Sequence, residues 1–268
     1  MQAPCTISVA SGKGGVGKTL TVVHLALSLR RLGKKVLVFD GDLGMANIDV
    51  VLGLQPRATL YDVLEGTATL EEVILTGPLG IQVIPSGSGL ASLQNLSRVQ
   101  KQILLSQLTQ VSQQYDVLLL DSGAGIGDNV LHINGLADTH VIVTTPEPHA
   151  MTDAYAVMKV LSENQNIQHF NLIVNMTVSE AEGEQTAARL SSVAKQYADF
   201  TLSYLGHVPR DPVLSKKMYQ LSKVLTAPAQ TLSAQAWHLL ARKLITRIPT
   251  SSITPAFWEN LFHIASQP

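Results

Sequence analysis

The sequence predicts an α/β fold, a mostly parallel twisted sheet with helices covering both of its faces. Apolar, strand-like runs alternate with helix-like stretches along the chain, as they do in successive strand–helix–strand units. Two of the runs, 36–39 and 117–120, end directly in an aspartate. The residues are 46% hydrophobic and only 15% charged, which suits a sheet buried on both faces and argues against disorder.

The overall composition limits the possible functions. A length of 268 residues allows one large α/β domain or two small ones. The formal net charge of −1 gives no electrostatic reason to bind nucleic acid or an anionic membrane. A single cysteine, Cys5, excludes a disulfide framework and a cysteine-ligated iron–sulfur or zinc site within one chain. Because no signal peptide and no apolar run of about 18 residues occurs, we expect a cytoplasmic protein that does not span a membrane.

The first expected strand, residues 2–10, leads into a glycine-rich loop. From Gly12 to Thr19 the chain matches the pattern G-x-x-x-x-G-K-[ST], with a strand before it and a helical pattern after it. Glycines let successive backbone N–H groups turn inward around an anion, Lys18 can reach the β- and γ-phosphates, and the Thr19 hydroxyl can bind Mg²⁺. A tight strand-to-helix turn is the other use of such a loop, but the spacing and the acidic strand ends disfavour it. We therefore predict a nucleotide site with phosphate contacts from Gly12, Gly14, Gly15, Val16, Gly17, Lys18, Thr19 and Leu20.

A second lysine, Lys13, lies inside the loop, although Lys18 already meets the phosphate requirement. A solvated surface lysine is the simple explanation. The run from Lys13 to Thr19, K-G-G-V-G-K-T, resembles the deviant Walker A loop of the MinD/ParA class of P-loop ATPases. The resemblance implies a P-loop NTPase fold of the MinD-like type and a homodimer that encloses ATP. In that dimer Lys13 would reach the partner's nucleotide and stabilise transition-state charge, as an arginine finger does.

The second expected strand, residues 34–40, follows a helix over 19–31. It ends in the acidic segment D-G-D-L-G-M-A-N-I-D, which begins at Asp40. A solvated turn is one explanation of an Asp-x-Asp pair, but the segment resembles the first switch of the MinD/ParA class. The resemblance implies that Asp42 orients the attacking water and contributes to the metal site. It also implies that Asn47 senses the γ-phosphate or the dimer contact.

The middle of the chain is expected to supply connections and a covering helix. Residues 53–80 form a connection with one short amphipathic helix, and a strand over 81–85 leads into a flexible loop over 86–89. A helix over 97–114 is expected to pack on the sheet. The apolar side of that helix consists of Val99, Ile103, Leu104, Leu108 and Val111.

Residues 115–121 have the form of a Walker B strand, an apolar run that ends in a carboxylate. Asp121 would hold Mg²⁺ through the water shell of the ion, because Mg²⁺ dehydrates reluctantly. The glycine-rich residues 122–127 resemble a second switch, which must move when the γ-phosphate is lost. The two acidic strand ends and the phosphate loop together form a specific combination.

Further strands are expected at 139–145, 171–175 and 202–208. The helix after the first of them is expected to open near residue 151, with Thr152 or Asp153 at its N-cap. Another helix covers 181–198. In the MinD/ParA class a strand-end Asn and a Pro-x-Asp loop bracket the adenine, with turn formation and capping as alternative roles. The matching residues here are Asn175, Pro209, Arg210 and Asp211.

Residues 229–247 are expected to form the last helix of a P-loop ATPase domain that spans 1–248. Residues 249–268 are expected to form a linker and a short C-terminal amphipathic helix. Its apolar stripe consists of Phe257, Trp258, Leu261, Phe262 and Ala265. The stripe is explained by docking on the chain's own core or dimer, or by a reversible membrane-surface contact of the kind found in the MinD class. The membrane explanation lacks the usual basic face, since the nearby cations upstream are Arg242, Lys243 and Arg247.

Three segments look most like the flagellar-number regulators of the MinD class, the FlhG/FleN type: 42–54, 121–127 and 144–156. Gly123 stands where a division-site MinD more usually has a proline. The resemblance implies a cytoplasmic ATP switch that limits flagellar number and placement. Such regulators bind a flagellar transcription activator and a signal-recognition-type GTPase. Members that stimulate that GTPase carry a segment ahead of the loop, and ten residues precede Ser11 here.

The resemblance implies a slow switch more than a fast catalyst. ATP and Mg²⁺ would order the segments after Asp42 and Asp121 and build a two-fold symmetric face sealed by two copies of Lys13. Slow hydrolysis would then return the protein to the monomer. The alternatives are a regulator with negligible turnover, a division-site-positioning MinD-type ATPase peripheral to the inner membrane, and a ParA-type ATPase that partitions DNA or cargo. We expect no direct sequence-specific binding of nucleic acid.

Overall fold

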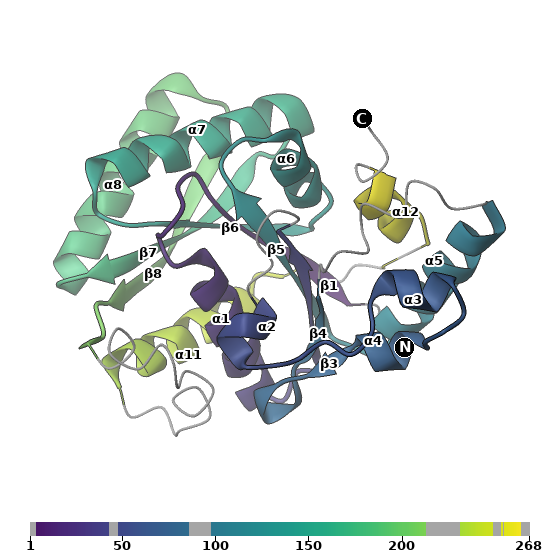
Figure 1. The fold of residues 1–268 in the computed structure, drawn as a ribbon. Coiled ribbons are helices and arrows are strands. Elements are labelled where there is room, and N and C mark those ends of the chain that lie inside the picture. Colours follow the sequence, from purple (N-terminus) through teal and green to yellow (C-terminus); the bar gives the residue numbers. More distant parts are fainter. Residues whose placement is uncertain are drawn as a thin grey trace.

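The computed structural model describes residues 4–42, 48–85, 98–212, 231–248, 253 and 255–263. The described chain forms an eight-stranded sheet in the order β3-β4-β2-β5-β1-β6-β7-β8, with helices on both sides (Figure 1). All neighbouring strands are parallel except β3, which pairs antiparallel with β4 at the edge. The strands are β1 (Cys5–Ser11), β2 (Val36–Gly41), β3 (Leu75–Thr76), β4 (Gln82–Ile84), β5 (Val117–Ala124), β6 (Thr139–Thr144), β7 (His169–Thr177) and β8 (Thr201–Pro209). The predicted fold class is confirmed.

Alternate residues of the strands point to opposite faces of the sheet, and each face has its own covering helices. One face packs against α1 and α11, and the other packs against α5 and α12 over one half and against α7 and α8 over the other half. The helices are α1 (Lys18–Arg31), α2 (Ile48–Leu52), α3 (Leu60–Leu64), α4 (Leu70–Val73), η1 (Pro78–Gly80), α5 (Arg98–Ser112), α6 (Asp128–Gly135), α7 (Pro148–Gln165), α8 (Glu180–Tyr197), α11 (Leu232–Ile245) and α12 (Pro255–His263). The order of the strands brings the carboxyl ends of β1, β2 and β5 side by side, with Asp40 level with Asp121.

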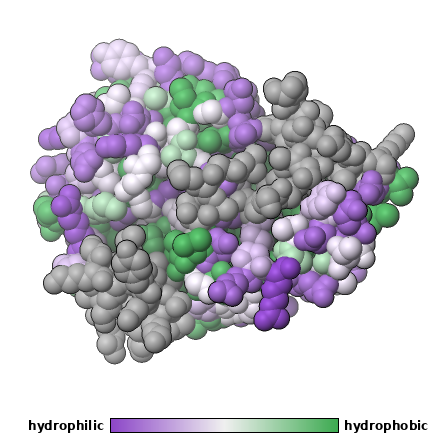
Figure 2. Space-filling view, in the orientation of Figure 1, coloured by the Kyte–Doolittle hydropathy of each residue, from purple (hydrophilic) through white to green (hydrophobic). Residues whose placement is uncertain are grey.

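The predicted apolar face of α5 is wrong in part. Val99 and Ile103 are 64% and 52% exposed, whereas Leu104 and Leu108 are buried against β2 and β5. Successive helical residues are rotated by about 100°, so Ile103 and Val99 lie about 100° or more away from the buried stripe. Figure 2 shows hydrophobic surface at this outer end of α5.

Other local expectations are also corrected. The helix α7 begins at Pro148 with Glu147 as its N-cap, and not near Thr152 or Asp153, because a proline suits the first turn, where no intrahelical N–H bond is needed. The hydroxyl of Thr152 donates instead to the carbonyl of Pro148 at 3.1 Å. The connection over 53–80 contains α4, β3 and η1 in addition to the expected helix α3, and α6 was not anticipated. The expected loop at 86–89 and Asn47 lie outside the described residues.

The C-terminal helix α12 docks on the chain's own core, the first of the two explanations for its apolar stripe. Trp258 is fully buried and meets the ring of Phe39 edge-on, with the ring centroids 6.1 Å apart. Leu261 is also buried, and the carbonyl of Asn260 lies 2.5 Å from the ring of His132. The side chain of Phe262 and residue Ala265 lie outside what the structure describes. Within the described part of the chain, none of the helices is long and apolar enough to cross a bilayer.

Candidate nucleotide site

The glycine-rich loop joins β1 to α1 at the carboxyl edge of the sheet, and close neighbours dictate two of its glycines. A Cβ on Gly12 would lie 2.1 Å from the backbone carbonyl of Asp153 in α7. Gly17 has a left-handed φ of 88°, and a Cβ there would lie 2.4 Å from the side-chain nitrogen of Asn175. Lys18 opens α1, so the N–H groups of the first helical turn face the loop. The loop therefore has the glycine conformation and the helix N-terminus on which the predicted phosphate contacts depend.

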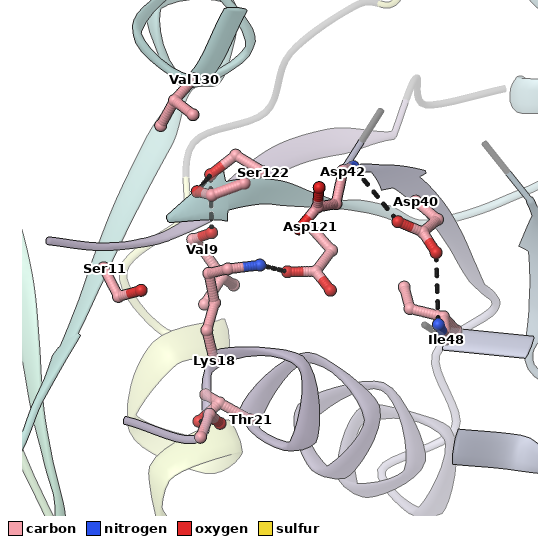
Figure 3. Close-up of polar contacts among 12 residues, drawn as sticks. Val9, Ser11, Lys18, Thr21, Asp40, Asp42, Ile48, Asp121, Ser122 and Val130 are labelled. Atoms are coloured by element: carbon pink, nitrogen blue, oxygen red, sulfur yellow. Dashed lines mark hydrogen bonds and ion pairs between the residues drawn. The ribbon is translucent and has the colours of Figure 1, made fainter. Parts of the chain in front are cut away.

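Lys18 and Asp121 form a buried ion pair directly behind the loop (Figure 3). The side chains are 8% and 2% exposed. Burial raises the pKa of the Asp121 carboxyl, whereas the charge and hydrogen bond of Lys18 and the hydroxyl of Thr19 favour the ionised form. Thr19 of the loop and Asp121 of the Walker B strand, both predicted to bind Mg²⁺, are thus in contact with one another. The Asp121 carboxylate and the Thr19 hydroxyl are oxygen donors of the kind that Mg²⁺ combines with water and phosphate oxygens, so the donor set fits Mg²⁺.

Asp40 shapes the turn that presents Asp42. The Asp40 carboxylate is buried and accepts the N–H groups of Asp42 and Ile48, each at 3.2 Å (Figure 3). The Asp42 carboxylate lies beside the second switch, because a Cβ on Gly123 would be 3.9 Å from its Oδ1. Asp42 and Asp121 are close enough for the charge of Asp42 to raise the pKa of Asp121. The positioning role of Asp40 was not predicted, although its place at the strand end was visible in the sequence.

The start of the second switch is tied to β1 by side-chain and backbone bonds. Ser122 donates to the carbonyl of Val9 at 3.1 Å, and the amide of Asn134 in α6 donates to Ser122 at 2.9 Å. The N–H of Gly125 donates to the carbonyl of Ser11 at 2.9 Å. Sequence reasoning missed Asn134. The available signal was a single amide among the apolar residues of 130–136, a place where a polar side chain needs a buried partner.

Lys13 lies on the surface of the loop and forms an ion pair with Glu147, with its Nζ 3.4 Å from the Glu147 carboxylate. Both side chains are largely exposed, at 43% and 58%. Glu147 was not predicted as a partner, since 134 residues separate the two. The role of Lys13 across a dimer interface stays a prediction.

The residues predicted to bracket the adenine converge at the carboxyl ends of β7 and β8. Asn175 donates from its amide to the carbonyl of Val16 at 2.8 Å, so it holds the phosphate loop against β7. Arg210 follows Pro209, the last residue of β8, and donates from Nε to the carbonyl of Met176 at 3.0 Å. Their contact with a base stays a prediction.

The neighbours of these residues complete that corner of the site. Asp211 accepts a short hydrogen bond from Ser233 in α11. Met176 has a φ of 58°, a conformation that non-glycine residues adopt mainly where the surroundings impose it. This corner is therefore held by bonds that link β7, β8, α11 and the phosphate loop.

A family model described as ParA, NUBPL iron-transfer P-loop NTPase, matches residues 3–245 of the chain. The description names iron transfer, but the one cysteine of this chain, Cys5, is buried in β1. Burial, with a smaller contribution from Asp138, raises the pKa of its thiol to about 12, which disfavours the thiolate that ligates metals.

Two bacterial proteins resemble most of the chain. Antiactivator FleN of Pseudomonas aeruginosa is 39% identical over 238 residues, covering 89% of this chain and 85% of that protein. Flagellum site-determining protein YlxH of Helicobacter pylori is 35% identical over 248 residues, covering 92% and 84%. The solved structure of septum site-determining protein MinD of Pyrococcus horikoshii, complexed with Mg-ADP, is 27% identical and superimposes with a TM-score of 0.66, covering 90% of this chain and 96% of that one.

Proposed function

The chain belongs to the ParA/MinD family of P-loop NTPases, and from that premise we propose that it is an ATP-dependent dimerising switch that regulates flagellar number and placement. Members of the family are ATPases, and this chain is an ATPase. The observation that carries the proposal is the buried pair of Lys18 and Asp121 behind a phosphate loop whose extra lysine, Lys13, reaches the surface. The pair supports nucleotide binding, and the surface lysine supports a contact with a second copy.

Each site residue has a role that its position supports. Lys18 contacts the β- and γ-phosphates, and the N–H groups from Gly14 to Leu20 surround them. Thr19 and Asp121 would hold Mg²⁺, and the bound ion would neutralise phosphate charge. Asp42 would orient the attacking water from the neighbouring strand end, and its carboxylate would also contribute to the metal site.

Exposed apolar side chains near the same edge of the sheet support closure of two copies over the nucleotide. They lie on the segments that follow β2, β5 and β7 and at the start of α11, beside Asp211. Such side chains on the surface of a folded chain mark interaction sites when they gather near one place. They are Val50, Ile126, Val178 and Leu232.

The dimer switch is tested by size-exclusion chromatography with light scattering in the presence of ATP and Mg²⁺. We expect Asp42→Ala to give a long-lived dimer, because ATP binds but is not hydrolysed, and Lys18→Ala to stay monomeric because nucleotide binding is lost. Lys13→Ala should bind ATP and fail to dimerise. An Asp42→Ala protein that binds ATP and remains monomeric would overturn the switch.

The biological role rests on the similarity to FleN and YlxH. We propose that the ATP dimer binds a flagellar transcription activator and, as a second partner, a signal-recognition-type GTPase. Deleting the gene in the native organism should raise the number of flagella per cell counted by electron microscopy. Wild-type protein should restore the count and Lys18→Ala should not. An unchanged count in the deletion strain would reject this role while leaving the ATPase intact.

A division-site role is the second candidate, because the chain superimposes on a MinD along most of its length. That role predicts ATP-dependent sedimentation with anionic lipid vesicles and loss of sedimentation when residues 249–268 are removed. Trp258 is buried against Phe39, so α12 would have to leave the core before it could meet lipid. Sedimentation of full-length protein together with misplaced division in the deletion strain would favour this candidate over the flagellar one.

A further inference from the structure

A polar cavity of about 440 Å³ lies at the edge of the sheet opposite the nucleotide site. Its walls are the residues that follow α6 and α7 and the first residues of β6 and β7. Because these strands are parallel to β1, their first residues lie at the end of the sheet away from the phosphate loop. None of the site residues named above lines this cavity. Its volume is in the range of pockets that hold small metabolites.

Arg247 supplies the positive charge of the cavity, and a buried amide orients it. Asn171, on β7, is 3% exposed and belongs to the lining. Its Oδ1 accepts from Nη1 of Arg247 at 3.4 Å, and its Nδ2 donates to the carbonyl of His140 at 3.4 Å. Arg247 is exposed and belongs to the lining, and the paired N–H groups of its planar guanidinium match the two oxygens of a carboxylate.

Hydrogen-bond acceptors line the same cavity. The hydroxyl of Thr201 donates to the carbonyl of Gln168 at 3.1 Å, so it accepts from Nδ1 of His169 at 2.8 Å. With Nδ1 as the donor, Nε2 is the acceptor nitrogen of the ring in its neutral form. Both α6 and α7 end at the cavity. The last backbone carbonyls of a helix accept no intrahelical N–H, because no further helical turn follows them.

The charges of the lining select the class of ligand. Asp138 also belongs to the cavity, and its Oδ2 accepts the N–H and hydroxyl of Thr6 at 2.8 and 2.5 Å. One guanidinium beside one carboxylate suits a ligand with a single negative group and neighbouring donors more than it suits a dianionic phosphate. We propose that this cavity binds a small organic acid that also carries amino or hydroxyl donors, an amino acid or a hydroxy acid, with Arg247 holding its carboxylate. The proposal is independent of the proposed switch function.

The test uses ¹⁵N-labelled full-length protein and follows the side-chain amide signals of Gln165, Gln168 and Asn171 and the Nε–H signal of Arg247. The probes are the twenty standard amino acids, lactate, malate and gluconate at millimolar concentration, with succinate as a carboxylate that lacks the donors and inorganic phosphate as an anion that lacks a carboxylate. We expect saturable shifts from at least one amino acid or hydroxy acid. Shifts from none of them, or from phosphate or succinate alone, would overturn the proposal.

Variants then assign the contact. Arg247→Gln should weaken binding of the active probe tenfold or more, about the loss expected for a charge-assisted bidentate contact. Arg247→Lys keeps the charge without the fork and should weaken binding less. Arg242→Gln, at an exposed position of α11 outside the cavity, is the matched control and should bind as wild type. Unchanged affinity in both Arg247 variants would refute the assignment, and nucleotide binding reports that each variant is folded.

Discussion

Removing the ammonium of Lys18 should destabilise the nucleotide-free protein in a pH-dependent way. Lys18→Met keeps most of the side-chain volume and leaves the buried Asp121 carboxylate without its cation. Breaking a buried ion pair by removing one partner costs about 3–5 kcal/mol. We therefore expect the free energy of unfolding to fall by about that amount near neutral pH.

The pH dependence follows from the direction of the Asp121 pKa. Burial raises this pKa, and Lys18 is the largest influence that lowers it, so the substitution raises it further. A carboxyl whose folded-state pKa is raised binds its proton more tightly in the folded than in the unfolded state. Its contribution to stability is fully present below the unfolded pKa of about 3.9 and is lost as the pH rises through the folded pKa. The penalty of Lys18→Met should therefore shrink as the pH is lowered from about 7.5 to about 5.

Urea unfolding of the nucleotide-free protein at the two pH values measures the effect. Lys159→Met is the matched control, because Lys159 pairs with Glu163 on the exposed face of α7 and such pairs are worth about 0.3–0.5 kcal/mol. Adding Asp121→Asn to Lys18→Met should recover most of the loss, since no buried charge remains. A Lys18→Met penalty no larger than that of Lys159→Met, or one that does not change with pH, would refute the reasoning.

Three further outcomes are expected. Gly12→Ala should lower nucleotide affinity tenfold or more in a fluorescent-nucleotide titration, because its Cβ would meet the Asp153 carbonyl at 2.1 Å and displace the loop. Gly14→Ala, with open space at that Cβ, should lose less affinity. Equal losses of affinity in the two variants would contradict this reason. Trp258→Ala should lower the free energy of unfolding in urea by about 3–5 kcal/mol, and Phe257→Ala should lower it less because Phe257 is half-buried. A reversed order would show that α12 does not pack as described. Burial lowers the pKa of His24 to about 4, and the charge of Arg31 adds to the effect. The free energy of unfolding should therefore fall by up to about 3 kcal/mol as the pH drops from about 6.5 to about 4. A His24→Gln variant should show a flatter dependence of this free energy on pH.

Much of the nucleotide site could be predicted because it is built from local patterns. The spacing from Gly12 to Thr19 sets the loop, and an aspartate after an apolar strand marks the carboxyl edge of a parallel sheet. Asp40 and Asp121 lie 81 positions apart in the sequence and level in the sheet, as parallel strands with acidic ends should. The apolar face of α5 and the start of α7 were less predictable, because several apolar or capping residues compete for the same role within one turn.

The sequence by itself determined the α/β class, the strand–loop–helix that forms the phosphate loop and the acidic strand ends, since each depends on residues close together in the chain. Tertiary structure alone decided that Lys13 pairs with Glu147, that Asn134 bonds Ser122, that Asn171 orients Arg247 and that α12 covers Phe39. The reason is physical: hydrophobic burial selects which faces meet without specifying individual partners, and a polar side chain finds its partner only after packing has placed the elements.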